Sequence, residues 1–255
     1  MIKDLKQTKK ETLQQIKKDE EWLWGLLGKV ERADWPTYAK AHAVAQNAYG
    51  RASYLVGQDD DAVKFLNWAI TLHMPSSSSF PDAYTNLASV YLRQKESLSP
   101  DWAEKTEEYL QQALKISPSN QKAHHQLGSL YSDPNVAKYD EPKYDKAIEH
   151  FKQAGNNAWS IFFHARILVE QKKELTQGII LLLRSLRLKQ EPDSRYDYLV
   201  KTLTSHGVNA KLPKDLLTAV QELAKRMKRG SMNEERWQEH KEFLVVLKLL
   251  LAALP

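Results

Sequence analysis

The sequence has 255 residues, of which 42% are hydrophobic and 27% charged, and its formal net charge is +5. This composition is typical of a soluble protein, and the length suits one large domain or a stack of short repeats. Because there is no cysteine, disulfides, thiolate metal sites and cysteine nucleophiles are excluded. Only nine Gly and ten Pro interrupt the helix-forming residues, so we expect an all-α protein.

Apolar residues at helical spacing predict a first helix from Ile2 to Leu27, which ends near Gly28. We expect this helix to cover the end face of the stacked helices that follow. The next predicted helices run from Pro36 to Val56 and from Asp59 to Met74.

A second pair of helices follows a polar turn. Its first helix opens at Pro81, and its second opens near Asp101. Residues 92–98 leave two possibilities open, since they either lengthen the first helix or bulge outward. Pro118 closes the pair.

The clearest pattern in the chain lies between Gln121 and Ala154, where two helices flank an insert at 133–139. It consists of three small and three large residues, namely Gly128, Ala147, Ala154, Leu127, Tyr131 and Phe151. The small residues let two antiparallel helices approach closely, and the large ones fill the space between neighbouring helices. One such pair cannot bury its own apolar face, so we expect further pairs beside it.

Five more helices are predicted, at 159–170, 176–189, 194–205, 213–229 and 234–254. The helix at 176–189 is apolar on several sides, which is typical of a buried helix. The last helix carries more apolar surface than an end cap needs. It either lies across the preceding repeats or docks on a partner, and the sequence leaves both open.

The Leu-Gly-x-x-Tyr and Ala-x-x-x-Phe-x-x-Ala runs resemble the tetratricopeptide repeat, a helix–turn–helix unit of 34 residues. The resemblance covers 43–192, with three recognisable units and a fourth, degenerate one. It implies an all-α, right-handed α-solenoid of antiparallel helix pairs with capping helices at both ends. The organisation we expect is a capping helix at 1–35, repeats at 36–192, and at 193–255 a degenerate helical pair plus an apolar capping or docking helix.

The family resemblance also implies a function. Its members bind a peptide or helix of another protein in a concave groove lined by the first helix of each repeat. We therefore expect a non-catalytic scaffold or adaptor that acts as a subunit of a larger complex. In some chaperone-binding members this groove holds a partner's C-terminal carboxylate, and those places fall here on Asn47, Arg51, Asn86, Lys122 and Gln126. Asn86 and Lys122 match in residue type and the other three differ, so a generic polar groove stays open as an alternative.

No pattern points to catalysis, because the P-loop, the Gly-rich dinucleotide turn and His-Glu-x-x-His are all absent. We expect no cofactor, no metal and no small-molecule substrate. The alternative function is a nucleic-acid-associated repeat protein that acts in a ribonucleoprotein or defence complex through its basic surface. The candidate basic-aromatic patch for that function comprises Lys138, Tyr139, Lys143, Tyr144 and Lys146.

Two features bear on location. The charged start of the chain, residues 1–6, lacks the apolar core of a secretory signal. The longest apolar run, 243–254, is broken by Lys248 and is too short to span a bilayer. We expect a cytoplasmic protein without a membrane span.

Overall fold

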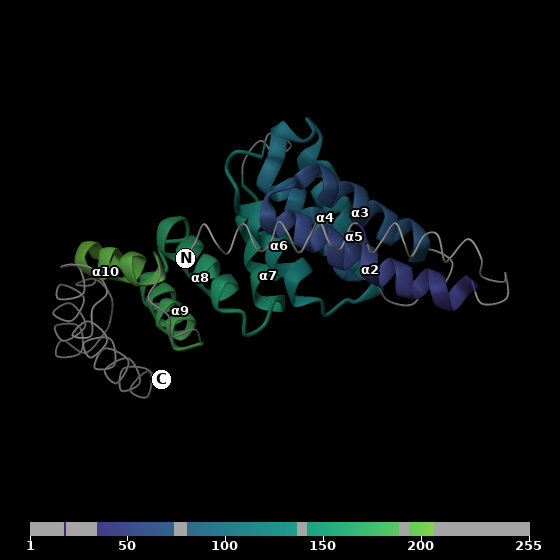
Figure 1. The fold of residues 1–255 in the computed structure, drawn as a ribbon. Coiled ribbons are helices and arrows are strands. Elements are labelled where there is room, and N and C mark those ends of the chain that lie inside the picture. Colours follow the sequence, from purple (N-terminus) through teal and green to yellow (C-terminus); the bar gives the residue numbers. More distant parts are fainter. Residues whose placement is uncertain (1–17, 19–34, 74–80, 137–141, 189–193, 207–255) are drawn as a thin grey trace, which may run out of the picture. The chain divides into compact units, whose positions relative to one another are not determined.

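A computed structural model describes Lys18 and residues 35–73, 81–136, 142–188 and 194–206 (Figure 1). Within these ranges the chain forms α-helices, one short 3-10 helix and no strand. The expected all-α fold is confirmed. The helices predicted at 2–27, 213–229 and 234–254 lie outside the described residues.

The helices follow one another with short connections. In chain order they are α2 (Trp35–Val56), α3 (Asp59–His73), α4 (Pro81–Gln94), the 3-10 helix η3 (Lys95–Ser97), α5 (Trp102–Ile116), α6 (Gln121–Ser132), α7 (Tyr144–Gln153), α8 (Ala158–Glu170), α9 (Leu175–Leu188) and α10 (Ser194–His206). Where a start or end was predicted, it lies within a few residues of these bounds. Residues 92–98 lengthen the first helix of their pair, because α4 continues to Gln94 and then tightens into η3.

The chain divides into two compact units, each described here by itself. One unit comprises Met1–Leu130 with Asn135–Asp140, and the other comprises Tyr131–Pro134 with Glu141–Pro255. The division falls at the end of α6 and in the insert that follows it. The expected boundaries at 35 and 192 border residues outside the described ranges and stay predictions.

In the first unit α2 packs on α3, α4 packs on α5, and α3 packs on α4. Gly50 in α2 allows this helix to lie very close to α3. A Cβ at this position would lie 2.5 Å from Leu66 Cγ and 3.2 Å from the carbonyl oxygen of Ala62. Only glycine therefore lets α2 and α3 come this close. Small apolar residues continue the contact, and Ala43, Ala62 and Ala69 are fully buried.

A charged cluster joins the first helix pair to the second. The Arg93 guanidinium lies over the Tyr54 ring, 3.7 Å from its centre, and its Nη1 donates to the Tyr54 carbonyl oxygen at 2.7 Å. Its Nη2 donates to the carboxylate of Asp59, which also accepts from Gln94. Gly57 makes the turn between α2 and α3 with a φ of +82°, a conformation that favours glycine.

In the second unit α8 packs on α7 and α9, and α9 packs on α10. Asn157 caps α8, since its side chain accepts from the N–H groups of Trp159 and Ser160, both at 3.0 Å. A Cβ at Gly178 of α9 would lie 2.5 Å from Val169 Cγ2 of α8, so this contact also depends on a glycine. The apolar residues of α9 are buried as predicted, including Ile179, Leu181, Leu182, Leu183 and Leu186.

An arginine anchors α10 on the rest of this unit. Arg195 is fully buried, and its Nη1 donates to the carbonyl oxygen of Ser185 at 2.8 Å. Its guanidinium lies 5.2 Å from the centre of the Trp159 ring. Because a buried guanidinium is costly without such partners, these contacts fix where α10 begins.

None of the helices in the described part of the chain combines the length and apolar character that crossing a bilayer requires.

Candidate partner-binding face

The five residues that the family resemblance singled out lie on α2, α4 and α6, within the first unit. We call this set the α2–α4–α6 face; it consists of Asn47, Arg51, Asn86, Lys122 and Gln126. Three of the five form a ladder across the helices. Asn86 Nδ2 donates to Asn47 Oδ1 at 2.8 Å, and Lys122 Nζ donates to Asn86 Oδ1 at 2.5 Å. Asn86 is buried, so its amide links α2 to α6 from within the fold.

Gln126 lies deeper and also serves the fold. Its side chain is 7% exposed, and its Nε2 donates to the Thr85 carbonyl oxygen at 3.1 Å and to Ser89 Oγ at 2.6 Å. Its Oε1 is buried and accepts no hydrogen bond from the described residues. The sequence pattern did not point to Thr85 or Ser89. Both belong to a helix about forty positions earlier in the chain, and only packing of α6 on α4 brings them to Gln126.

The two cations of the face, Arg51 and Lys122, remain exposed at the surface. The pKa of Lys122 is lowered to about 8, chiefly because its ammonium is crowded by protein atoms and next because of the positive charge of Arg51. Lys122 as a residue is exposed, and its ammonium group donates to Asn86. Asp82 at the start of α4 acts in the opposite direction, but more weakly. An anion placed between the two cations would favour the charged form of Lys122.

Apolar side chains flank these charges on α2. Val44 is 49% exposed and Leu55 is 59% exposed, values unusual for large hydrophobic residues in this chain. They lie seven residues before and four residues after Arg51, a spacing that places all three on one side of the helix. Ala48 on the same side is also exposed. This side of α2 can therefore contact an apolar group and an acidic group of the same ligand.

The candidate basic-aromatic patch is described in part. Lys138 and Tyr139 lie outside the described residues, whereas Lys143, Tyr144 and Lys146 lie at the start of α7 in the second unit. The N–H of Lys143 donates to the Tyr131 carbonyl oxygen at 2.8 Å. Lys146 Nζ lies 5.7 Å from the centre of the Tyr131 ring, which stacks on His150. One of the lysines thus contributes to packing, and a nucleic-acid role for the patch stays a prediction.

The described residues offer no metal site, since they contain no group of three or more His, Asp or Glu placed to hold an ion. The adjacent histidines are separately engaged. His124 is buried with its Nε2 at 2.8 Å from the Pro118 carbonyl oxygen, and burial lowers the pKa of His125. Neither arrangement resembles a nucleophile with its base.

A scan of protein-family models and a search of curated proteins each found no match. Among solved structures, the chain is similar to one that reports the functional characterization of PilF of Pseudomonas aeruginosa, a tetratricopeptide-repeat protein. The TM-score is 0.57 and the sequence identity is 17%, and the match covers 85% of this chain and 95% of that one. At this identity the likeness shows the fold alone, which is all-helical and similar to that of tetratricopeptide-repeat proteins.

Proposed function

We propose that the protein is a non-catalytic interaction scaffold, a subunit of a larger complex, that binds a peptide or helix of a partner on the α2–α4–α6 face. The observation that supports this most directly is the pair of exposed cations, Arg51 and Lys122, of which Lys122 is hydrogen-bonded to the buried amide of Asn86. The ladder fixes the position of Lys122. Because the positive charge of Arg51 acts on Lys122, binding of an anion between the two side chains would be favourable.

The partner segment would therefore carry an acidic group beside an apolar one. A C-terminal carboxylate next to a large apolar side chain has this chemistry, and so does an acidic amphipathic helix. The carboxylate would lie between Arg51 and Lys122. The apolar group would cover Val44 or Leu55, which face solvent on the same helix.

Partner capture with charge-removing variants tests the proposal. The double variant Arg51→Gln/Lys122→Gln should lose partner proteins that the unaltered chain captures from its native lysate. The matched control is Lys115→Gln, which removes an exposed positive charge from the last turn of α5 in the same unit. Melting temperatures of all three proteins show whether the fold is intact. If the double variant captures the same partners as the control, the α2–α4–α6 face is not the binding site.

The same experiment separates the proposal from the nucleic-acid alternative. Half of each sample is treated with nuclease and washed at high salt. Protein partners that survive both treatments support the scaffold. Capture that disappears with nuclease would instead assign the function to the basic surface, because counterion release makes nucleic-acid binding steeply salt-dependent.

A further inference from the structure

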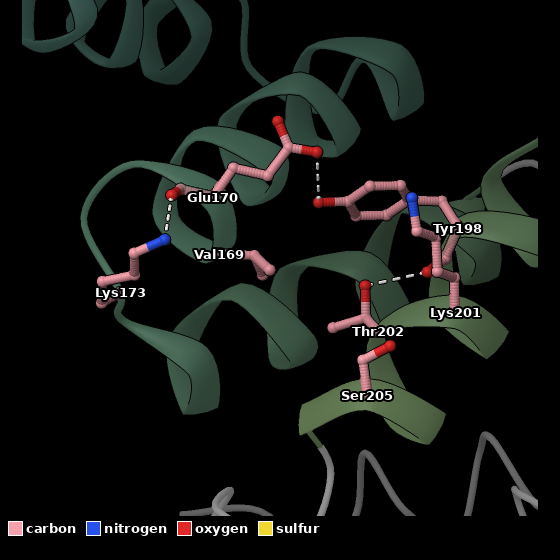
Figure 2. Close-up of a pocket in the computed structure, with 7 residues that line it drawn as sticks. All are labelled: Val169, Glu170, Lys173, Tyr198, Lys201, Thr202 and Ser205. Atoms are coloured by element: carbon pink, nitrogen blue, oxygen red, sulfur yellow. Dashed lines mark hydrogen bonds between the residues drawn. The ribbon is translucent and has the colours of Figure 1, made fainter.

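A pocket in the second unit lies between the end of α8 and α10, in a region that no sequence pattern singled out (Figure 2). Its volume is about 240 Å³, and it is lined by Val169, Glu170, Lys173, Tyr198, Lys201, Thr202 and Ser205. Ligand pockets usually enclose about 300–1,000 Å³. The occupant must therefore be small, of the size of one side chain or a short organic acid.

Among the described residues that line this pocket, Glu170 alone carries a carboxylate, and this group already contacts other protein groups. The Tyr198 hydroxyl donates to Glu170 Oε1 at 2.9 Å, and Arg166 Nη2 lies 3.5 Å from Oε2. The Arg166 guanidinium also lies 5.5 Å from the centre of the Tyr198 ring. Burial, and then the bond to Glu170, raise the pKa of Tyr198, so its hydroxyl stays a donor to Glu170. The negative charge of Glu170 is thus offset by Arg166 at the surface, and its Oε1 is occupied by the Tyr198 hydroxyl.

Positive charge remains on the pocket wall. Lys173 comes from the turn after α8 and Lys201 comes from α10, so two separate segments each supply an ammonium group. Lys173 Nζ donates to the carbonyl oxygen of Glu170 at 2.6 Å, which uses one of its three N–H donors. Lys173 and Lys201 thus place two ammonium groups on the pocket wall, in addition to the pair that Arg166 forms with Glu170.

The backbone at Lys173 is strained. Its φ is +57°, in the left-handed region that glycine adopts far more readily than lysine. The turn is fixed on both sides, since Lys172 N–H donates to Ile167 O at 3.1 Å and Glu174 N–H donates to Leu168 O at 2.9 Å. Strained residues that the surrounding structure holds in place cluster at ligand-binding sites.

The remaining wall adds a hydroxyl and an apolar contact. Ser205 lies one turn after Lys201 on the same side of α10, beside Thr202, whose hydroxyl donates to the Tyr198 carbonyl oxygen at 2.8 Å. The Ser205 hydroxyl can donate to an anion. Val169 projects between α8 and α10 and offers an apolar surface.

We propose that this pocket binds a compact oxyanion, a carboxylate or phosphate, carried on a short apolar stem. Lys173 and Lys201 neutralise the anion, Ser205 donates a hydrogen bond to it, and Val169 contacts the stem. This site is separate from the α2–α4–α6 face, because all of its residues belong to the second unit.

The test uses the full chain, labelled with ¹⁵N, and follows amide signals of residues 171–174 and α10 during titration. The probes are glutarate, inorganic phosphate and a blocked tripeptide with a central glutamate, each compared with chloride at equal ionic strength. We expect saturable shifts with at least one probe. Stronger binding of the tripeptide identifies the source as a protein side chain, and stronger binding of a free acid identifies a small molecule. If no probe saturates, the proposal is wrong.

Two variants and a matched control make the result specific. Lys173→Gly removes the ammonium and relieves the backbone strain, so it should melt no lower than the unaltered chain yet bind about tenfold more weakly. Lys201→Met should weaken binding similarly. The control, Lys172→Met, removes a charge one residue away that pairs with Asp145 at 2.7 Å instead of lining the pocket. Equal weakening by the control would show general charge attraction and overturn the proposal.

Discussion

At the scale of single residues, folding disfavours the charged form of Lys122. Its pKa is about 8 in the folded chain, against an ordinary value of 10.5, because of burial and then because of Arg51. Between these values the unfolded chain binds more protons than the folded one, so folding stability contributed by this group rises with pH across that window. We predict that Lys122→Gln removes this rise.

The measurement is urea unfolding of the unaltered chain and Lys122→Gln at neutral pH, which lies below this window, and near pH 9, which lies within it. The control is Lys115→Gln, whose exposed lysine lies in the last turn of α5. The difference between the two pH values should shrink only in Lys122→Gln. An equal change of stability with pH in all three proteins would contradict the prediction.

His164 makes a second prediction at this scale, with the same sign at lower pH. Its pKa is lowered from 6.5 to about 4, first by burial and then by the positive charge of Lys152. The histidine is therefore neutral in the folded chain, and protonation favours the unfolded chain as pH falls from 6.5 towards 4. We predict that His164→Gln loses less stability than the unaltered chain between pH 7 and pH 4.5. Thermal melts at both values, with the histidine ring signals followed by NMR, would check this.

The register of the helices predicts that Asn47, Asn86 and Lys122 lie near one another, but the burial of Gln126 could not be predicted. Asn47, Asn86 and Lys122 are brought together because each occupies its place on the first helix of a pair. Gln126 looks like a surface residue in the sequence. It is buried because Thr85 and Ser89 accept from it across a helix interface, and no local pattern encodes that contact. Asn86→Ala would thus remove two internal hydrogen bonds as well as the proposed partner contact, which makes it a poor test of binding.

At the scale of elements, the contact between α2 and α3 depends on Gly50. Alanine is the better helix former by about 0.5–1 kcal/mol, so propensity alone would make Gly50→Ala stabilising. The added Cβ, however, would lie 2.5 Å from Leu66 Cγ and 2.8 Å from Cδ2, closer than real contacts allow. We predict that Gly50→Ala destabilises the chain by about 1–3 kcal/mol, the usual cost of overpacking.

The matched variants separate sterics from backbone effects. Leu66→Ala alone opens a cavity, and Gly50→Ala combined with Leu66→Ala should recover part of the loss, since the smaller side chain leaves room for the new Cβ. Chemical denaturation followed by circular dichroism measures all three. If the two losses simply add, the two positions do not interact as described.

The helices themselves were the part of the fold that could be predicted from the sequence. Apolar spacing and the signals at Pro81 and Pro118 mark starts and ends to within a few residues. The pocket beside α10 could not be predicted from the sequence. It depends on the left-handed turn at Lys173, where the sequence carries a lysine instead of the glycine that usually signals such a turn. Regular elements follow from repeated local signals, whereas this turn follows from how α8 and α9 pack.

At the scale of the whole molecule, the charge distribution separates the two functions considered. The formal net charge of +5 is modest, and cations are present in both units. A nucleic acid neutralised by about 6–10 such cations would lose about 10³–10⁵ in affinity between about 50 and 200 mM salt. A partner that contacts only these two cations, Arg51 and Lys122, beside the apolar Val44 and Leu55 would release far fewer counterions on binding.

We therefore predict that affinity for the captured partner falls by no more than about tenfold over that salt range, since only two cations are neutralised and the apolar contact persists. Titrations at several salt concentrations measure the slope. Lys143→Gln/Lys146→Gln, which removes two lysines at the start of α7, should leave both affinity and slope unchanged. A steep dependence of affinity on salt that this double variant weakens would assign the function to the basic-aromatic patch instead of the α2–α4–α6 face.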